Sequence, residues 1–193
     1  MENIKNLQAS FHGNVDTVKV LTKAGGNVNQ AKTTDGASPL YIASQQGNID
    51  TVKVLIDAGS KVNQALTTDG SSPLYIAADK GHVAIVEVLL KAGGDIHQVI
   101  TTGGMSPLYI ASQNGNIDIV KILIEAGGDV HQVSNDGHTV LGASSHEGRL
   151  EIVRLLLQQP NIDINKGAEG WSPLALAGNH AEIIQLLKDA GAQ

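Results

Sequence analysis

The sequence predicts an all-α repeat solenoid, in which short helix-turn-helix units stack one on the next. The first observation is a four-residue motif, Ser-Pro-Leu-Tyr, that recurs at residues 38–41, 72–75 and 106–109, with a period of 34 residues. The second is that residues 38–64 and 106–132 are identical at 20 of 27 positions. The third is the glycine content, 22 of 193 residues, against a usual content of about 7%. Together they indicate tandem duplication of a short unit that needs glycine at fixed places.

Each repeat is predicted to contain two helices. Ser38 is a good N-cap, Pro39 suits the first helical position because its missing N–H costs nothing there, and Gly47 ends the helix. Asn48 then caps a second helix, which ends at Gly59. The apolar side chains of that second helix fall on one face and are Ile49, Val52, Leu55 and Ile56. The unit is therefore a pair of antiparallel helices.

Extended segments are predicted to join the repeats. Residues 61–70 end in Thr-Thr-Asp-Gly, a composition typical of tight turns, so this segment is expected to form a hairpin-like finger. A helix of about eight residues is marginal in water by itself, so neighbouring repeats must stack to bury the apolar faces. At the N-terminus, Asn6 and Gln8 occupy slots that Leu40 and Ile42 fill one period later. We expect this first helix to turn them toward water.

The repeated pattern resembles the ankyrin repeat. It reads Asp-Gly-x-Ser-Pro-Leu-Tyr-x-Ala, then a Gly, then Val-x-Val-Leu-Ile-x-Ala-Gly. The resemblance implies one continuous domain over residues 1–193, with the first and last repeats as caps. Two departures from the family pattern are that tyrosine stands in a slot where the family usually has histidine, and that the first three fingers carry one extra residue. The tyrosines are Tyr41, Tyr75 and Tyr109. The six repeats cover residues 1–32, 33–66, 67–100, 101–133, 134–166 and 167–193.

Composition narrows the function classes. The formal net charge is −6, which is the wrong sign for a surface that neutralises nucleic acid or anionic lipid. No apolar run approaches the length that spans a bilayer, and the polar N-terminus lacks the apolar core of a secretory signal. There is no cysteine, which excludes disulfides and zinc-thiolate sites and suits a reducing compartment. We expect a cytoplasmic monomer without a cofactor.

Candidate catalytic and metal-binding groups do not form a recognised site. His131, His138 and His146 lack the spacing that places two ligands on one helical face, so no metal site is predicted. Serines recur before proline in four repeats, which indicates helix caps and not nucleophiles. The segment Ser144-Ser145-His146-Glu147 contains the three residue types of a serine–histidine–carboxylate catalytic triad. Adjacent residues on one helix, however, cannot converge on a common substrate atom. We predict that the chain is not an enzyme.

The resemblance implies that residues beside the Asp-Gly turn and at the end of each first helix line a concave groove and contact a protein partner. Phe11 and Trp171 are the two aromatic side chains free to act as anchors, and shielding the ends of the array is an equal alternative role for them. Glu169 adjoins Trp171 at the last turn. The other candidate contacts are Asp35, Gln45, Asp69, Asp79, Lys80, Met105, Gln113, Asn114, Asp136, His138, His146 and Glu147.

The predicted function is a protein-interaction module, a rigid scaffold that holds another protein and performs no chemistry. A preformed groove orders little on binding and so loses less entropy than a flexible loop would. Two alternatives stay open: an inhibitor or regulatory subunit whose groove blocks an enzyme, and an architectural fragment of a longer ankyrin array.

Overall fold

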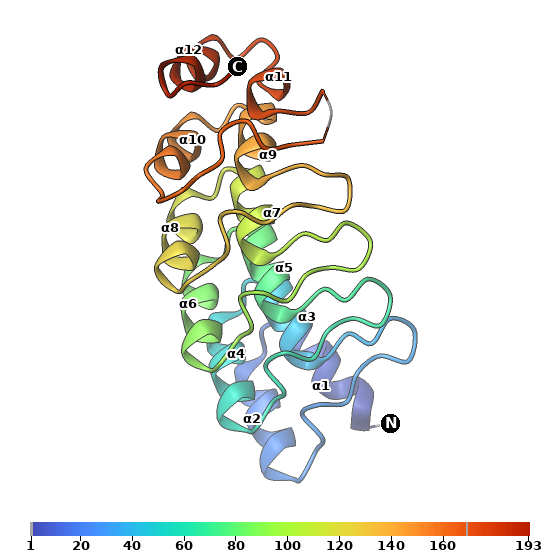
Figure 1. Ribbon diagram of the computed structural model, residues 1–193. Helices are drawn as coiled ribbons and strands as arrows, with labels where there is room; N and C mark the ends of the chain where they lie inside the picture. The colour runs from blue at the N-terminus through green and yellow to red at the C-terminus, as the bar shows by residue number, and fades with distance from the viewer. Residues whose placement is uncertain (1, 169) are drawn as a thin grey trace. The chain divides into compact units, whose positions relative to one another are not determined.

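The computed structural model describes residues 2–168 and 170–193. These residues form twelve helices and no strand, which confirms the predicted all-α helix-turn-helix architecture (Figure 1). The chain divides into two compact units, Met1–Ile100 and Thr101–Gln193. The expectation of one continuous domain stays a prediction. The helices are α1 (Glu2–Phe11), α2 (Val15–Lys23), α3 (Pro39–Gln46), α4 (Ile49–Asp57), α5 (Pro73–Lys80), α6 (Val83–Lys91), α7 (Pro107–Asn114), α8 (Ile117–Glu125), α9 (Val140–His146), α10 (Leu150–Leu157), α11 (Pro173–Leu176) and α12 (Ala181–Asp189).

Each unit consists of two layers of helices. In the first unit α1, α3 and α5 pack side by side, and α2, α4 and α6 form the second layer, each against the first-layer helix that precedes it. The second unit repeats this arrangement with α7, α9 and α11 in one layer and α8, α10 and α12 in the other. The fingers project from the first-layer side within each unit (Figure 1).

The first-layer helices begin and end as predicted. The Ser38 hydroxyl accepts a hydrogen bond from the Tyr41 amide at 3.1 Å, Pro39 takes the first helical position, and Gly47 ends the helix with φ +78°. Gly47 is required here because a left-handed backbone is strained for residues that carry a Cβ. Three further serines cap their helices in the same way and are Ser72, Ser106 and Ser172. The prediction that these serines are caps is confirmed.

The core lies between the two layers. Val52 and Leu55 of α4 are fully buried, as the apolar pattern predicts, whereas Ile49 and Ile56 are half-buried at the edge of the face. In the second unit the largest fully buried side chains of the successive repeats are Leu108, Ile119, Leu123, Leu141, Ile152, Leu156 and Ile183. One apolar layer thus runs through each stack and supplies most of its stability.

The first repeat differs from the expectation. Gln8 is exposed, as predicted, but Asn6 is only 3% exposed, so the prediction that it faces water is wrong. The slot of Asn6 faces α2 and lies against Gly26, beyond the end of that helix. Packing between the two helices of the repeat therefore buries this position whatever residue occupies it.

The fingers are narrow hairpins. In residues 27–38 the Lys32 amide donates to Ala37 O at 2.9 Å, and the Gly36 amide closes the tip onto Lys32 O at 3.0 Å. In residues 129–139 of the second unit the matching bond joins the Ser134 amide to His138 O at 2.9 Å, across a tip that is one residue shorter. The extra residue of the early fingers therefore lies in the tip.

The repeat around α9 is predicted to be the least stable part of the second unit. Gly142 stands in the slot of the packed tyrosine ring Tyr109 and is buried inside α9, where glycine costs roughly 1 kcal/mol relative to alanine. Leu176 fills part of the space beside it. In native-state hydrogen exchange we expect amides 152–156 of α10 to exchange at least about fivefold faster than amides 119–124 of α8. Equal or reversed protection would show that Leu176 compensates fully for the missing ring.

Candidate functional site

In the first unit the predicted contact residues lie at finger tips and at helix ends. The carboxylates at the tips hold their own turns, because Asp35 Oδ1 accepts from the Ala37 amide at 3.0 Å and Asp69 Oδ1 accepts from the Ser71 amide at 2.9 Å. Both aspartates are half-buried. Their first role is therefore to shape the finger, and only their outward sides are open to a partner.

The helix ends of the first unit are polar and partly engaged. Gln45 is half-buried at the end of α3. At the end of α5 the Lys80 ammonium lies 2.9 Å from Asp79 Oδ2. An ion pair exposed to this degree adds little stability. The two side chains therefore present opposite charges next to each other, and they do not form a field of one sign.

In the second unit the structure brings two predicted contact residues together. Trp171 is 49% exposed, and its ring centroid lies 5.0 Å from that of His138 on the neighbouring finger, with the rings tilted by 45°. Asp136 is exposed on the same finger as His138, and Met105 is half-buried. Glu169 lies outside the described residues. The result is an aromatic pair on two adjacent finger tips, in which Trp171 is exposed and His138 is half-buried.

The helix ends of the second unit carry the remaining candidates. Gln113 is half-buried and Asn114 is exposed at the end of α7. At the end of α9, His146 Nδ1 lies 3.1 Å from Glu147 Oε1. These polar side chains lie at the ends of α7 and α9, and their contact with a partner stays a prediction.

The structure gives the serines beside His146 a structural role. Ser144 and Ser145 are fully buried, and their hydroxyls donate to Val140 O and Leu141 O, each at 2.8 Å. Both hydroxyls therefore bond to the backbone of their own helix. In the part of the chain that the structure describes, no group of three or more His, Asp or Glu side chains is arranged to hold a metal ion.

Sequence reasoning missed a hydrogen bond between neighbouring repeats within each unit, which we call the latch. It runs from a side chain at the start of a second-layer helix to a backbone carbonyl at the end of the first-layer helix in the preceding repeat. Asn48 sits at the start of α4 but makes no cap, and its Nδ2 reaches back to Ser10 O at 2.8 Å. In the matching position His82 Nε2 lies 3.2 Å from Gln45 O, and it must donate because a carbonyl oxygen only accepts. In the second unit Arg149 Nε donates to Gln113 O at 2.9 Å, and His180 Nε2 lies 3.1 Å from His146 O.

The signal for the latch is present in the sequence. In the first five repeats the residue that follows the glycine at the end of the first helix carries a side-chain N–H group, although its chemistry changes between asparagine, histidine and arginine. In the last repeat the latch residue, His180, stands one position further along, after Asn179. The glycine itself makes room for it, because a Cβ at Gly47 would lie 2.8 Å from the His82 ring. The ends of α3, α7 and α9 are thus each held by the next repeat of the same unit.

The tyrosines are structural. The Tyr41 ring is buried, and its hydroxyl lies 3.5 Å from Ser71 Oγ in the next finger. Burial raises the pKa of Tyr41 above its ordinary value of 10.0, against the lowering by Ser71. Burial likewise raises the pKa of Tyr109, against the lowering by its hydrogen bond to Ser134. Both phenols are therefore held in the neutral form.

This burial predicts a loss of stability in base. A phenol whose pKa is raised in the folded state stabilises the fold fully below the unfolded pKa of about 10, and that stability is lost as the pH rises through the folded pKa. We expect the free energy of unfolding in urea to fall less steeply between about pH 9.5 and 11 when Tyr41 and Tyr109 are both replaced by phenylalanine. Parallel curves for the wild type and the double variant would contradict the assignment.

Phe11 lies at the end of α1, in the first repeat of the first unit. It is 51% exposed and borders a cavity of about 630 Å³ between α1 and the first finger. Its slot corresponds to that of Gln45 one period later. Phe11 therefore does not simply shield the end of the stack, because it also forms one wall of an open cavity.

Comparison with known proteins identifies the repeat. A family model described as "Ankyrin repeats (3 copies)" matches residues 7–100, 63–133 and 108–193, and so spans almost the whole chain. A search of curated proteins finds no match. Among the described residues no helix is long and apolar enough to span a membrane. The helix pairs, the capped first helices and the paired fingers agree with the family match, and the chain belongs to the ankyrin repeat family.

Proposed function

We propose that this protein is a cytoplasmic, monomeric interaction module that binds another protein through the finger tips and first-helix ends of its second unit. Ankyrin repeats are generally protein-interaction modules, which supports the class of function. The observation that carries the choice of surface is the aromatic pair of His138 and Trp171. Tryptophan is enriched among the residues that dominate binding energy.

The surface is prepared for binding before a partner arrives. His138 is anchored at its backbone, where its amide donates to Ser134 Oγ at 3.2 Å. The two fingers that carry the pair are joined by the Ala168 amide, which donates to Gly137 O at 3.3 Å. A surface held in this way loses little conformational entropy when it binds.

The test is affinity capture with a matched control. A variant with Met105, His138 and Trp171 replaced by alanine should lose partners that the wild type captures from lysate of the source organism. A control variant with Gln45 and Asp79 replaced by alanine should retain them. The same captured proteins on all three baits, or a loss confined to the control, would overturn the choice of surface.

A further inference from the structure

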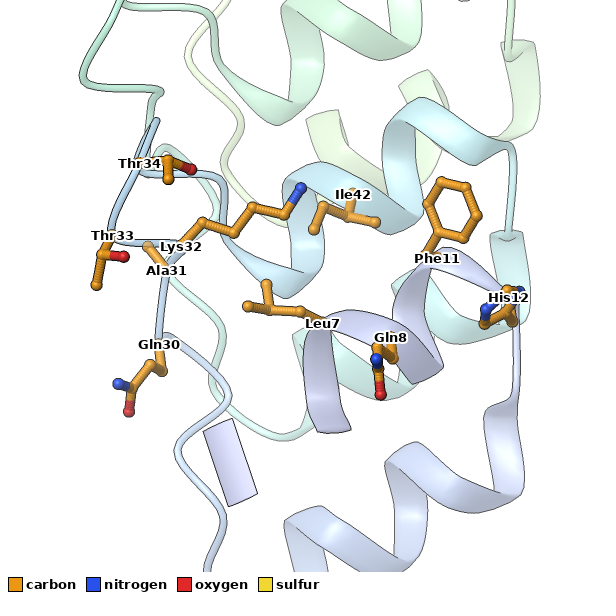
Figure 2. A pocket seen from close by; sticks show the side chains of 10 residues that line it. All are labelled: Leu7, Gln8, Phe11, His12, Gln30, Ala31, Lys32, Thr33, Thr34 and Ile42. Carbon is orange, nitrogen blue, oxygen red and sulfur yellow. The ribbon is translucent and has the colours of Figure 1, made fainter. Parts of the chain in front are cut away.

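The cavity at the N-terminal end of the first unit is open and largely apolar (Figure 2). Leu7 and Phe11 of α1, Ile42 of α3 and Ala31 of the first finger form its apolar walls. Its volume of about 630 Å³ is in the range of ligand-binding pockets. The remaining lining residues are polar and are Gln8, His12, Gln30, Lys32, Thr33 and Thr34.

One edge of the cavity is an unused hydrogen-bonding position. In the first unit the Thr67 amide of the second finger donates to Asp35 O of the first at 2.8 Å. Thr33 stands in the first finger where Thr67 stands in the second, three residues before the tip glycine. Thr33 is exposed, and among the described residues nothing accepts from its amide. The first finger therefore presents to the cavity side a donor that its sister finger uses for pairing.

The finger-to-finger bond is a regular feature of this fold. In the second unit the Asn135 amide donates to Gly103 O at 2.9 Å and the Ala168 amide donates to Gly137 O. In each of these bonds the donor and the acceptor are both backbone atoms, so the bond does not depend on the identity of the side chains. A segment of another protein that lies beside Thr33 could accept a hydrogen bond from the Thr33 amide, as one finger accepts from the next.

The cavity also has a preferred charge. Lys32 occupies the slot of Leu66, which packs against the buried cluster of Tyr41 and Ile42. Figure 2 shows the Lys32 side chain extended across the cavity toward Ile42. No aspartate or glutamate is among the lining residues that the structure describes. The Lys32 ammonium therefore gives the cavity a positive charge, although the net charge of the whole chain is −6. A positive charge at the cavity favours an acidic ligand over a basic one.

We propose that this cavity binds an extended, acidic segment of a partner protein. An apolar side chain of that segment fills the space between Leu7 and Phe11, a backbone carbonyl accepts from the Thr33 amide, and a carboxylate lies beside the Lys32 ammonium. The binding mode is addition of a strand to a free backbone edge, in which backbone bonds give affinity and the pocket gives specificity. This site is independent of the surface in the second unit.

The first experiment selects ligands with the intact chain. A random library of 12-residue peptides displayed on phage is panned on the wild-type protein, with a soluble Phe11→Ala, Lys32→Glu double variant as competitor. We expect enrichment of peptides in which an aromatic or aliphatic residue stands next to Asp or Glu. No enrichment over the competitor, or enrichment of basic peptides, would overturn the proposal.

The second experiment measures the most enriched peptide by fluorescence anisotropy. Phe11→Ala, Lys32→Glu and Thr33→Pro should each raise its dissociation constant at least about fivefold, because each removes one element of the site. Val20→Ala, at an exposed position on α2, should leave the dissociation constant unchanged. Circular dichroism is the control that shows whether Thr33→Pro is folded. Lys32→Glu tests the site independently, because it changes only a side chain. An unchanged constant in the folded variants places the peptide elsewhere and overturns the proposal.

Sedimentation velocity distinguishes a second copy of the chain as the occupant. The wild type should sediment as a single species across the concentration range. Self-association that is abolished by Phe11→Ala would assign the cavity to contact between copies and overturn the proposal.

Discussion

Replacing Gly36 with alanine is expected to destabilise the first unit by about 2–5 kcal/mol. Gly36 has φ +79°, where a residue with a Cβ costs about 1–2 kcal/mol. A Cβ at this position would also lie 2.9 Å from the backbone nitrogen of Thr67. The clash falls on the Thr67–Asp35 bond between the fingers, so the added methyl cannot be accommodated by a side-chain rotation alone.

A matched control separates the two costs. Gly59 has φ +85°, and a Cβ there would meet nothing within 4 Å. Gly59→Ala should therefore show only the backbone cost of about 1–2 kcal/mol in urea unfolding. The difference between the variants measures the clash between the fingers. If both lose the same free energy, the fingers move apart freely and their bond contributes little.

Replacing Trp171 with alanine is expected to weaken binding of the captured partner by about 2 kcal/mol or more, roughly a thirtyfold rise in the dissociation constant. The indole is the largest exposed side chain on the proposed surface, and His138 supports one side of it. Trp171→Phe should retain part of the affinity because an aromatic ring remains. The measurement is calorimetric titration of the purified partner.

Stability provides the control for this prediction. Trp171 is half exposed, so its removal should change the free energy of unfolding far less than the binding free energy. Asp79→Ala, at the end of α5 in the first unit, should leave the affinity unchanged. Retained affinity in Trp171→Ala, with a loss in Asp79→Ala, would move the binding surface to the first unit.

The helices could be predicted because local chemistry determines where they begin and end. Ser38 and Pro39 begin a helix and Gly47 ends it through hydrogen bonds and backbone angles within a few residues. The period of the repeat then places Val52 and Leu55 in the core without knowledge of the tertiary structure. The same period predicts that His138 and Trp171, 33 residues apart, occupy equivalent tips on adjacent fingers. Their ring contact follows from that spacing.

Features that depend on a neighbouring repeat could not be predicted in this way. Asn14 and Asn48 are the same residue in the same slot, yet Asn14 caps its own helix through the Thr17 amide, whereas Asn48 reaches back to the preceding repeat. Asn6 is buried because its slot faces α2, although its side chain is polar. The cavity beside Phe11 is bounded by α1, the first finger and Ile42 of α3, which are separated in the sequence and meet only in the fold. In each case the deciding contact is absent from the local sequence.

The latch has a consequence for how the gene can change. A bond from any reachable N–H group to a helix-end carbonyl is satisfied by Asn48, His82 and Arg149 alike, and neighbouring fingers within each unit share one bond that joins backbone atoms only. Hydrogen bonds of these two kinds can form between almost any two neighbouring repeats, because they depend little on which side chains are present. Residues 38–64 and 106–132 are identical at 20 of 27 positions, so gain or loss of whole repeats at these stretches should not create a mismatched junction. Alleles that differ in repeat number should fold as readily as this one and present surfaces of different length.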